Sequence, residues 1–128
     1  MEKLNTLSVL VVEDSNAIRS LIVKILKRKG IGKITQASNG KQALDAVTLL
    51  RPDLIISDLV MPEMNGVELL GNLQKHPEFK RIPFVVLTSK TEDATFKKIM
   101  GMGAADYIRK PFGEQELLVK LKSIAEWL

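Results

Sequence analysis

A chain of 128 residues is about the size of one domain, and 45% hydrophobic and 27% charged residues are typical of a folded globular protein. The absence of cysteine excludes disulfides and thiolate metal sites, and there is neither a signal-peptide pattern nor an apolar run long enough to span a bilayer. The net charge of +4 does not indicate nucleic-acid binding, because the basic residues are spread over expected helix faces without interleaved aromatic residues. We therefore expect one cytoplasmic domain over residues 1–128, without membrane insertion or direct nucleic-acid contact.

Five short apolar runs are expected to be strands buried in one sheet. In chain order they are Val9–Val12, Ile34–Ala37, Leu54–Ser57, Phe84–Leu87 and Ala105–Ile108. The second and fifth runs are more polar than the others, so we expect them at the edges of the sheet.

Apolar residues at helical spacing follow each strand and predict five helices. In chain order these apolar positions lie within 18–26, 43–50, 67–73, 96–100 and 117–128. The second helix is expected to begin at Asn39, with Gln42 placed as in a capping box, and the fourth to begin near Thr91. Gly30 and Pro52 are the predicted stops of the first two helices.

The strict alternation of strands and helices predicts a parallel sheet covered by helices on both faces. This is a doubly wound α/β fold of the flavodoxin-like type. With the more polar strands at the edges, the predicted strand order is 2-1-3-4-5. Its switch point lies between the first and third strands, which is where such sheets bind ligands.

Polar residues stand where four of the five predicted strands end. Glu13 and Asp14 follow the first strand, Asp58 the third, Thr88 the fourth and Lys110 the fifth. The carboxyl ends of parallel strands share one edge, so we expect these side chains in one pocket. Three neighbouring carboxylates repel one another unless a cation offsets their charge, and Mg²⁺ prefers such oxygen ligands.

A carboxylate in such a pocket can attack phosphorus and form an aspartyl phosphate. We assign this role to Asp58, which stands alone after a central strand, whereas Glu13 and Asp14 are adjacent metal anchors. Lys110 would neutralise the transferring group and Thr88 would donate a hydrogen bond to it. Taken singly, Thr88 is better explained as a turn residue and Lys110 as a surface lysine. Their position at the same edge of one sheet favours the functional interpretation.

Four motifs surround these positions: VVEDS in the first strand, SDLVMPEMNG around Asp58, LTS at Thr88 and DYIRKPF around Lys110. Together they resemble the receiver domains of bacterial two-component signalling, and the similarity runs over 8–128. Among these domains the chain is most similar to stand-alone chemotaxis-type response regulators. Without the resemblance, 61–66 would be only a long turn in which Gly66 permits an unusual backbone angle.

The resemblance implies a phosphorylation-operated signalling switch that takes its phosphoryl group from a histidine kinase on Asp58. It implies Mg²⁺ ligation by Glu13, Asp14, Asp58 and the carbonyl of Val60. It also implies that Thr88 and Lys110 contact the phosphoryl group, and that the Lys110–Pro111 bond is cis. Such a domain assists its own phosphorylation and dephosphorylation but is not a conventional enzyme.

Tyr107 matches the family's aromatic switch residue, which turns inward when the threonine moves toward the phosphate. The implied output face, where a downstream protein binds, comprises the fourth helix, the fifth strand and the closing helix. Tyr107 is otherwise simply a half-buried strand aromatic. Lys97, Lys98 and Lys120 near this face indicate an acidic partner, or are only solvated charges.

The chain departs from chemotaxis-type response regulators at positions expected near the phosphoryl group. Val60 and Lys90 replace an Asn and a Glu that tune hydrolysis there, and Ser89 replaces a smaller residue, which should be tolerated. Val60 cannot orient an attacking water through a side-chain hydrogen bond. We therefore expect slow self-dephosphorylation.

Three alternative interpretations are each less well supported by the sequence. A magnesium-dependent phosphohydrolase would usually carry a second acid at position 60, where this chain has Val60, and a cap insertion, which this chain lacks. A flavodoxin-like cofactor binder would need a Gly- or hydroxyl-rich loop where EDSNAIRS offers acids. The chain could also be the receiver part of a larger DNA-binding regulator. The helix closing at 126–128 with no linker favours a stand-alone protein, although a truncated chain would look the same. The expected oligomeric state is a monomer or weak dimer.

Overall fold

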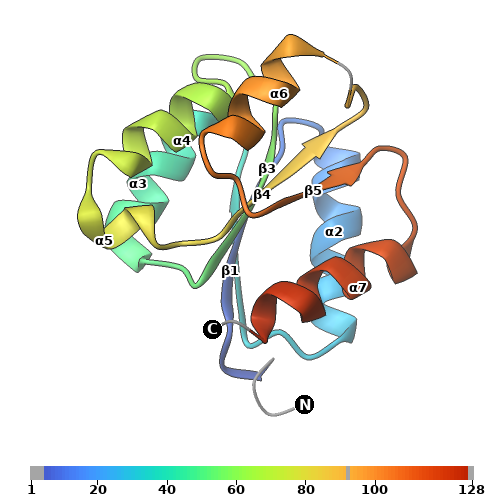
Figure 1. Ribbon diagram of the computed structural model, residues 1–128. Coiled ribbons are helices and arrows are strands. Elements are labelled where there is room, and N and C mark those ends of the chain that lie inside the picture. The colour runs from blue at the N-terminus through green and yellow to red at the C-terminus, as the bar shows by residue number, and fades with distance from the viewer. Residues whose placement is uncertain (1–4, 92, 127–128) are drawn as a thin grey trace.

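The computed structural model describes residues 5–91 and 93–126, which form one parallel sheet with helices on both faces (Figure 1). The strands are β1 (Ser8–Val12), β2 (Lys33–Ala37), β3 (Leu54–Asp58), β4 (Phe84–Thr88) and β5 (Asp106–Arg109). Their order is β2-β1-β3-β4-β5, and every neighbouring pair is parallel. The predicted fold class and strand order are confirmed.

Burial explains why the central strands read as continuous apolar runs. Every residue of β3 and β4 is buried, whereas the edge strands β2 and β5 each keep exposed and half-buried positions. A strand covered by helices on both faces has no solvent side, so it lacks the alternation of a one-sided sheet.

The helices divide the core into two layers, one on each face of the sheet. They are α2 (Asn16–Arg28), α3 (Gly40–Leu50), α4 (Gly66–Gln74), α5 (Pro77–Lys80), α6 (Ala94–Gly101) and α7 (Glu114–Ala125). Helices α2 and α7 pack on one face, and α3, α4, α5 and α6 on the other (Figure 1). Among the described residues, no helix is both long and apolar enough to cross a bilayer.

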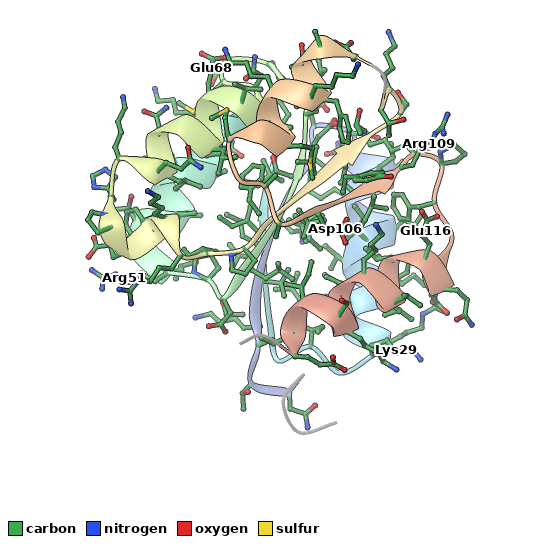
Figure 2. The ribbon with its side chains drawn as sticks, in the orientation of Figure 1. Lys29, Arg51, Glu68, Asp106, Arg109 and Glu116 are labelled. Carbon is green, nitrogen blue, oxygen red and sulfur yellow. The ribbon has the colours of Figure 1, made fainter. Side chains whose placement is uncertain are left out.

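The first two helices stop where the sequence predicted. Helix α2 is followed by Lys29 and by Gly30, whose φ of 82° is accessible to glycine without steric cost. Helix α3 ends at Leu50, and Arg51 before Pro52 takes a left-handed conformation with φ of 48°. Figure 2 labels Lys29 and Arg51 at these two helix ends.

The prediction of a capping box at Asn39 is wrong. Asn39 does cap α3 by accepting a hydrogen bond from the Gln42 amide, but the Gln42 side chain accepts from Ser38 instead of from Asn39. The reciprocal pair forms at Asn65 and Glu68, at the start of α4. The box therefore stabilises the helix that follows the Asp58 loop.

One helix boundary and one additional helix also differ from the prediction. Helix α6 begins at Ala94 instead of near Thr91, because Asp93 is its N-cap and accepts from the Thr95 amide. The short helix Pro77–Lys80 was not predicted; Pro77 occupies its first turn, where a missing amide hydrogen costs nothing. The predicted apolar position Leu128 lies outside the described residues.

Candidate functional site

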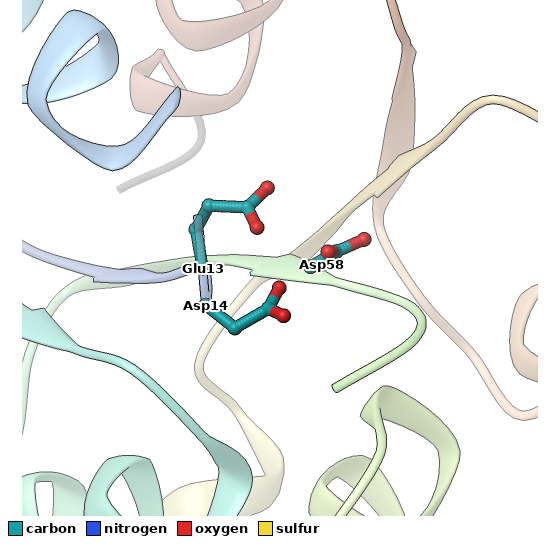
Figure 3. A group of neighbouring side chains, drawn as sticks. All are labelled: Glu13, Asp14 and Asp58. Atoms are coloured by element: carbon teal, nitrogen blue, oxygen red, sulfur yellow. The ribbon is translucent and has the colours of Figure 1, made fainter. Parts of the chain in front are cut away.

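Strand pairing brings the three predicted acids together. Because Val12 of β1 is in register with Ser57 of β3, the chain leaves both strands at the same level of the sheet. Glu13, Asp14 and Asp58 each have a carboxylate oxygen within 4.8 Å of the others. Figure 3 shows the side chains of Glu13 and Asp14 leaving the chain in opposite directions, with both carboxylate groups turned toward Asp58.

Glu13 is the most buried member of this group, with 1% of its surface exposed. Its Oε2 accepts a hydrogen bond from the Ser15 amide at 3.1 Å. Its Oε1 is buried and accepts no hydrogen bond from the described residues, but it lies 2.7 Å from Nζ of Lys110. Such an oxygen depends on a cation for its stability.

Asp58 ends β3 with 8% of its surface exposed. Its Oδ1 accepts from the Leu59 amide at 2.8 Å, and its Oδ2 lies 3.1 Å from Nζ of Lys110. The buried Ser57 hydroxyl donates to the Asp58 carbonyl. The carboxylate is thus held between a backbone amide and an ammonium group.

Lys110 joins two of the acids. Burial lowers the pKa of its ammonium group, but the contact with Glu13 and the charges of Asp58 and Glu13 outweigh this and raise the pKa above its ordinary value. The backbone amide of Lys110 donates to the Thr88 carbonyl at 2.8 Å, which fixes the end of β5 against β4. The Lys110–Pro111 bond is cis, as expected.

Thr88 ends β4 beside the same pocket and is buried. Its hydroxyl oxygen accepts from the Lys90 amide at 3.1 Å. An open pocket of about 250 Å³ is lined by Asp58, Val60, Thr88, Lys90 and Lys110 together with neighbouring loop residues and Thr95 of α6. Val60, with 74% of its surface exposed, therefore borders the pocket with an apolar side chain.

The donor set fits a hard divalent cation. Three carboxylates face one ammonium group, so the cluster keeps an excess of negative charge. The protein has no cysteine, and its only histidine, His76, lies before α5. Glu13, Asp14 and Asp58 could therefore hold Mg²⁺ through oxygen atoms, whereas a zinc site has no support.

The expectation that Gly66 provides an unusual backbone angle is wrong. A positive φ occurs in this loop at Glu63, with 65°, and not at Gly66. Gly66 is required by close approach, since an added Cβ would lie 2.9 Å from the Asp58 carbonyl oxygen. Its amide also donates to the Leu59 carbonyl, so the start of α4 packs directly on the Asp58 loop.

Tyr107 is half-buried on β5, whose ends are marked by Asp106 and Arg109 in Figure 2. Its ring packs edge to face on Phe96 of α6 with 5.1 Å between centroids. Nζ of Lys120 lies 4.6 Å from the ring centroid and 2.9 Å from the Asp106 carboxylate. Lys120 is therefore an internal partner of β5 rather than only a solvated charge.

Lys97 and Lys98, the other two lysines considered for an acidic partner, are exposed on α6. One residue beside the acids was not singled out from the sequence. The guanidinium of Arg19 in α2 donates to the Glu13 carbonyl at 2.7 Å. The only sequence signal was an arginine one helical turn beyond the acids.

Comparison with known proteins gives a consistent family match. A family model described as "Response regulator receiver domain" matches residues 9–122. The alkaline phosphatase synthesis transcriptional regulatory protein PhoP of Bacillus subtilis is 36% identical over 91% of this chain and 47% of its own length. Histidine kinase P4 of Formosa agariphila is 39% identical over 93% of this chain and 8% of its own length. The chain thus spans less than half of each of these curated relatives.

Solved structures match over nearly the whole chain. The chemotaxis response regulator CheY4 of Vibrio cholerae has a TM-score of 0.86 and 32% identity, covering 93% of this chain and 99% of that chain. The receiver domain of the sensor histidine kinase PA1611 from Pseudomonas aeruginosa, with a magnesium ion coordinated in its active site cleft, has a TM-score of 0.87 and 25% identity. That match covers 94% of this chain and 98% of that chain.

Proposed function

Because this chain belongs to the response regulator receiver domain family, whose members are phosphoacceptors in two-component signalling, we propose that it is a phosphorylation-operated binding switch. Asp58 accepts a phosphoryl group from a histidine kinase, and the modified domain changes its affinity for a downstream protein. The observation that carries the proposal is the acidic cluster of Glu13, Asp14 and Asp58 with Lys110 in contact with two of its members.

Magnesium is the proposed cofactor, and the Val60 carbonyl would join Glu13, Asp14 and Asp58 in holding it. When bound, Mg²⁺ offsets the negative charge of the carboxylates and the phosphoryl oxygens. The charge of the cluster supports this assignment, because in the described part of the chain three carboxylates face the ammonium group of Lys110, which contacts only Glu13 and Asp58 among them.

The protein residues supply positioning and charge. An oxygen of Asp58 bonds to phosphorus while the bond from phosphorus to the kinase histidine nitrogen breaks, and the electron pair leaves with that nitrogen. Lys110, whose raised pKa keeps it protonated, neutralises charge on the transferring group. The Thr88 hydroxyl, which accepts from the Lys90 amide, donates its hydrogen to a phosphoryl oxygen.

The proposed output face comprises α6, β5 and α7. Tyr107 pairs with Val86 in the sheet register, two positions before Thr88 on the same strand. A movement of Thr88 toward the phosphoryl group therefore occurs on the strand next to Tyr107. Tyr107 is half-buried between Phe96 of α6 and Lys120 of α7, so its ring contacts both helices of the proposed output face.

We further propose that residues 1–128 act as a single stand-alone cytoplasmic domain, monomeric or weakly dimeric. This part of the proposal rests on the similarity to the chemotaxis response regulator CheY4. The match to less than half of PhoP favours a second candidate, the receiver part of a larger transcriptional regulator. The full length of the gene product separates these candidates.

The test compares wild type with Asp58→Asn and with Asp45→Asn, a matched loss of an exposed carboxylate on α3. Each protein is incubated with Mg²⁺ and a phosphorylated histidine kinase, and the intact mass is measured. We expect one phosphoryl group on wild type and Asp45→Asn and none on Asp58→Asn. Modification of Asp58→Asn, or sustained turnover of a phosphomonoester by wild type, would refute the proposal.

A pull-down with and without beryllofluoride tests the switch itself. A downstream protein should be retained more strongly with this phosphoryl mimic, and Asp58→Asn should abolish the difference. Retention that is equal in both conditions would leave a phosphoacceptor without a binding output and would contradict this part of the proposal.

A further inference from the structure

Arg19 lies in the first turns of α2, half-buried beside the acidic cluster. In the described part of the chain its guanidinium forms no ion pair with any of the three carboxylates. Instead, Nη1 donates to the Glu13 carbonyl at 2.7 Å, Nε donates to Oε1 of Gln36 at 3.2 Å, and Nη2 donates to Oδ1 of Asn16. One side chain thus connects the end of β1, the start of α2 and strand β2.

The Glu13 carbonyl is part of the peptide that joins Glu13 to Asp14, the two adjacent acids of the cluster. The preceding peptide is held by the sheet, because the Glu13 amide donates to the Ala37 carbonyl at 3.0 Å. Beyond that point β1 has ended, and the donor that the structure gives the Glu13 carbonyl is Arg19. Arg19 therefore holds the peptide that joins the two residues bearing these carboxylates.

We propose that Arg19 is a positioning residue of the magnesium site, acting through the Glu13–Asp14 peptide and not through contact with the ion. The inference rests on the proposed function for the existence of the site, and it assigns to that site a supporting residue outside the ligand set. Outer partners that orient metal ligands typically contribute about 10- to 100-fold to metal affinity.

The charge of Arg19 makes the proposal easy to distinguish from a simple electrostatic effect. A guanidinium near a cation site repels the cation, so on charge alone its removal should strengthen Mg²⁺ binding. Loss of positioning should weaken Mg²⁺ binding instead. The two explanations therefore predict opposite changes in Mg²⁺ affinity for the same substitution of Arg19.

The experiment titrates Mg²⁺ into the unphosphorylated protein by calorimetry, without any kinase. Arg19→Gln is compared with Arg28→Gln, which removes the same charge from the same helix at the ion pair with Glu114. We expect Arg19→Gln to bind Mg²⁺ about 10-fold more weakly or worse, and Arg28→Gln to bind as wild type does. Arg19→Lys keeps the charge but not the fork of donors, so it should also bind more weakly than wild type.

Equal or tighter Mg²⁺ binding by Arg19→Gln overturns the inference while leaving the proposed function intact. Absence of Mg²⁺ binding by wild type overturns both. Melting curves of the metal-free variants show whether each is folded. If Arg19→Gln does not fold, Gln36→Ala replaces it, because this change removes one anchor of the guanidinium and leaves its charge in place. Weaker Mg²⁺ binding by Gln36→Ala supports the proposal, and unchanged binding refutes it.

Discussion

Replacing Asp58 with Asn removes one negative charge from the acidic cluster and nearly preserves the shape of the side chain. The Asn carbonyl oxygen can still accept from the Leu59 amide, as Oδ1 of Asp58 does. The substitution loses the attraction to Lys110 and also the repulsion from Glu13 and Asp14. The change in metal-free stability depends on which of these effects is larger.

The distances in the cluster give the expected sign. Two like charges within 4.8 Å of each other repel by at least about 3.5 kcal/mol at an effective dielectric of 20 and at least about 0.9 kcal/mol in bulk water. The attraction to Lys110 at 3.1 Å is about 5.4 kcal/mol and about 1.3 kcal/mol in the same two media. Asp58 has two acidic neighbours, so the summed repulsion exceeds the attraction to Lys110 by roughly 0.4 kcal/mol in water and roughly 1.6 kcal/mol at a dielectric of 20. The lower figure is the more appropriate one because Asp14 is exposed to solvent.

We therefore expect Asp58→Asn to raise the metal-free free energy of unfolding by about 1 kcal/mol, or the melting temperature by about 4 °C. Magnesium should reverse the order, since a ligand at 100 times its dissociation constant stabilises the wild-type fold by about 2.7 kcal/mol. The assay is thermal and urea denaturation with EDTA and with excess Mg²⁺. Asp45→Asn on α3 should change stability by less than about 0.5 kcal/mol in both media.

A marked loss of stability of metal-free Asp58→Asn would refute the reasoning. It would mean that the ion pair with Lys110 dominates and that the acids do not strain the fold. Equal stabilisation of wild type and Asp58→Asn by Mg²⁺ would show that Asp58 is not a ligand.

Four further predictions follow from the pocket and its surroundings. Val60→Asn should hydrolyse the acyl phosphate about five-fold faster than wild type, because an added hydrogen bond of about 1 kcal/mol can orient water; equal or slower decay contradicts this. Tyr107→Ala should impair partner binding more than phosphorylation, with Tyr107→Phe as the control that keeps the ring on Phe96. Lys110→Met should lower the free energy of unfolding near neutral pH by about 2 kcal/mol, since Glu13 stays buried without its cation. Because the pKa of Lys110 is raised above its ordinary 10.5, the stabilisation by Lys110 is fully present below pH 10.5 and is lost as the pH rises through the raised pKa. Urea denaturation at increasing pH should therefore show a loss of stability at alkaline pH in wild type that Lys110→Met lacks. Gly66→Ala should weaken beryllofluoride binding and lower the melting temperature, because its Cβ would press on the Asp58 carbonyl; an unchanged protein would show that the loop yields easily.

Local chain properties were enough to predict most of the fold. Continuous apolar runs marked β1, β3 and β4 as central, and polar residues marked β2 and β5 as edges, which led to the observed strand order. Errors in the prediction lie where neighbouring polar residues compete to cap a helix. Helix α6 begins at Ala94, after its N-cap Asp93, instead of near Thr91, and the side chain of Gln42 accepts from Ser38 instead of from Asn39.

The gathering of the acids was predictable because it follows from topology. Residues after parallel strands must meet at one edge, and Glu13, Asp14 and Asp58 do so within 4.8 Å. How each member of the pocket is supported was not predictable. The contact of Lys110 with both Glu13 and Asp58 depends on the path of the chain after β5, which the spacing of residues does not specify.

The sequence by itself determined which residues reach the site, because strand periodicity and chain connectivity are local properties of the chain. Only the tertiary structure decided which residues hold them in place. Arg19 supports the Glu13 carbonyl, Gly66 allows α4 to approach Asp58, and Lys120 covers Tyr107. Each is a contact between separate segments, and such contacts depend on how the helices pack against the sheet rather than on any pattern along the chain.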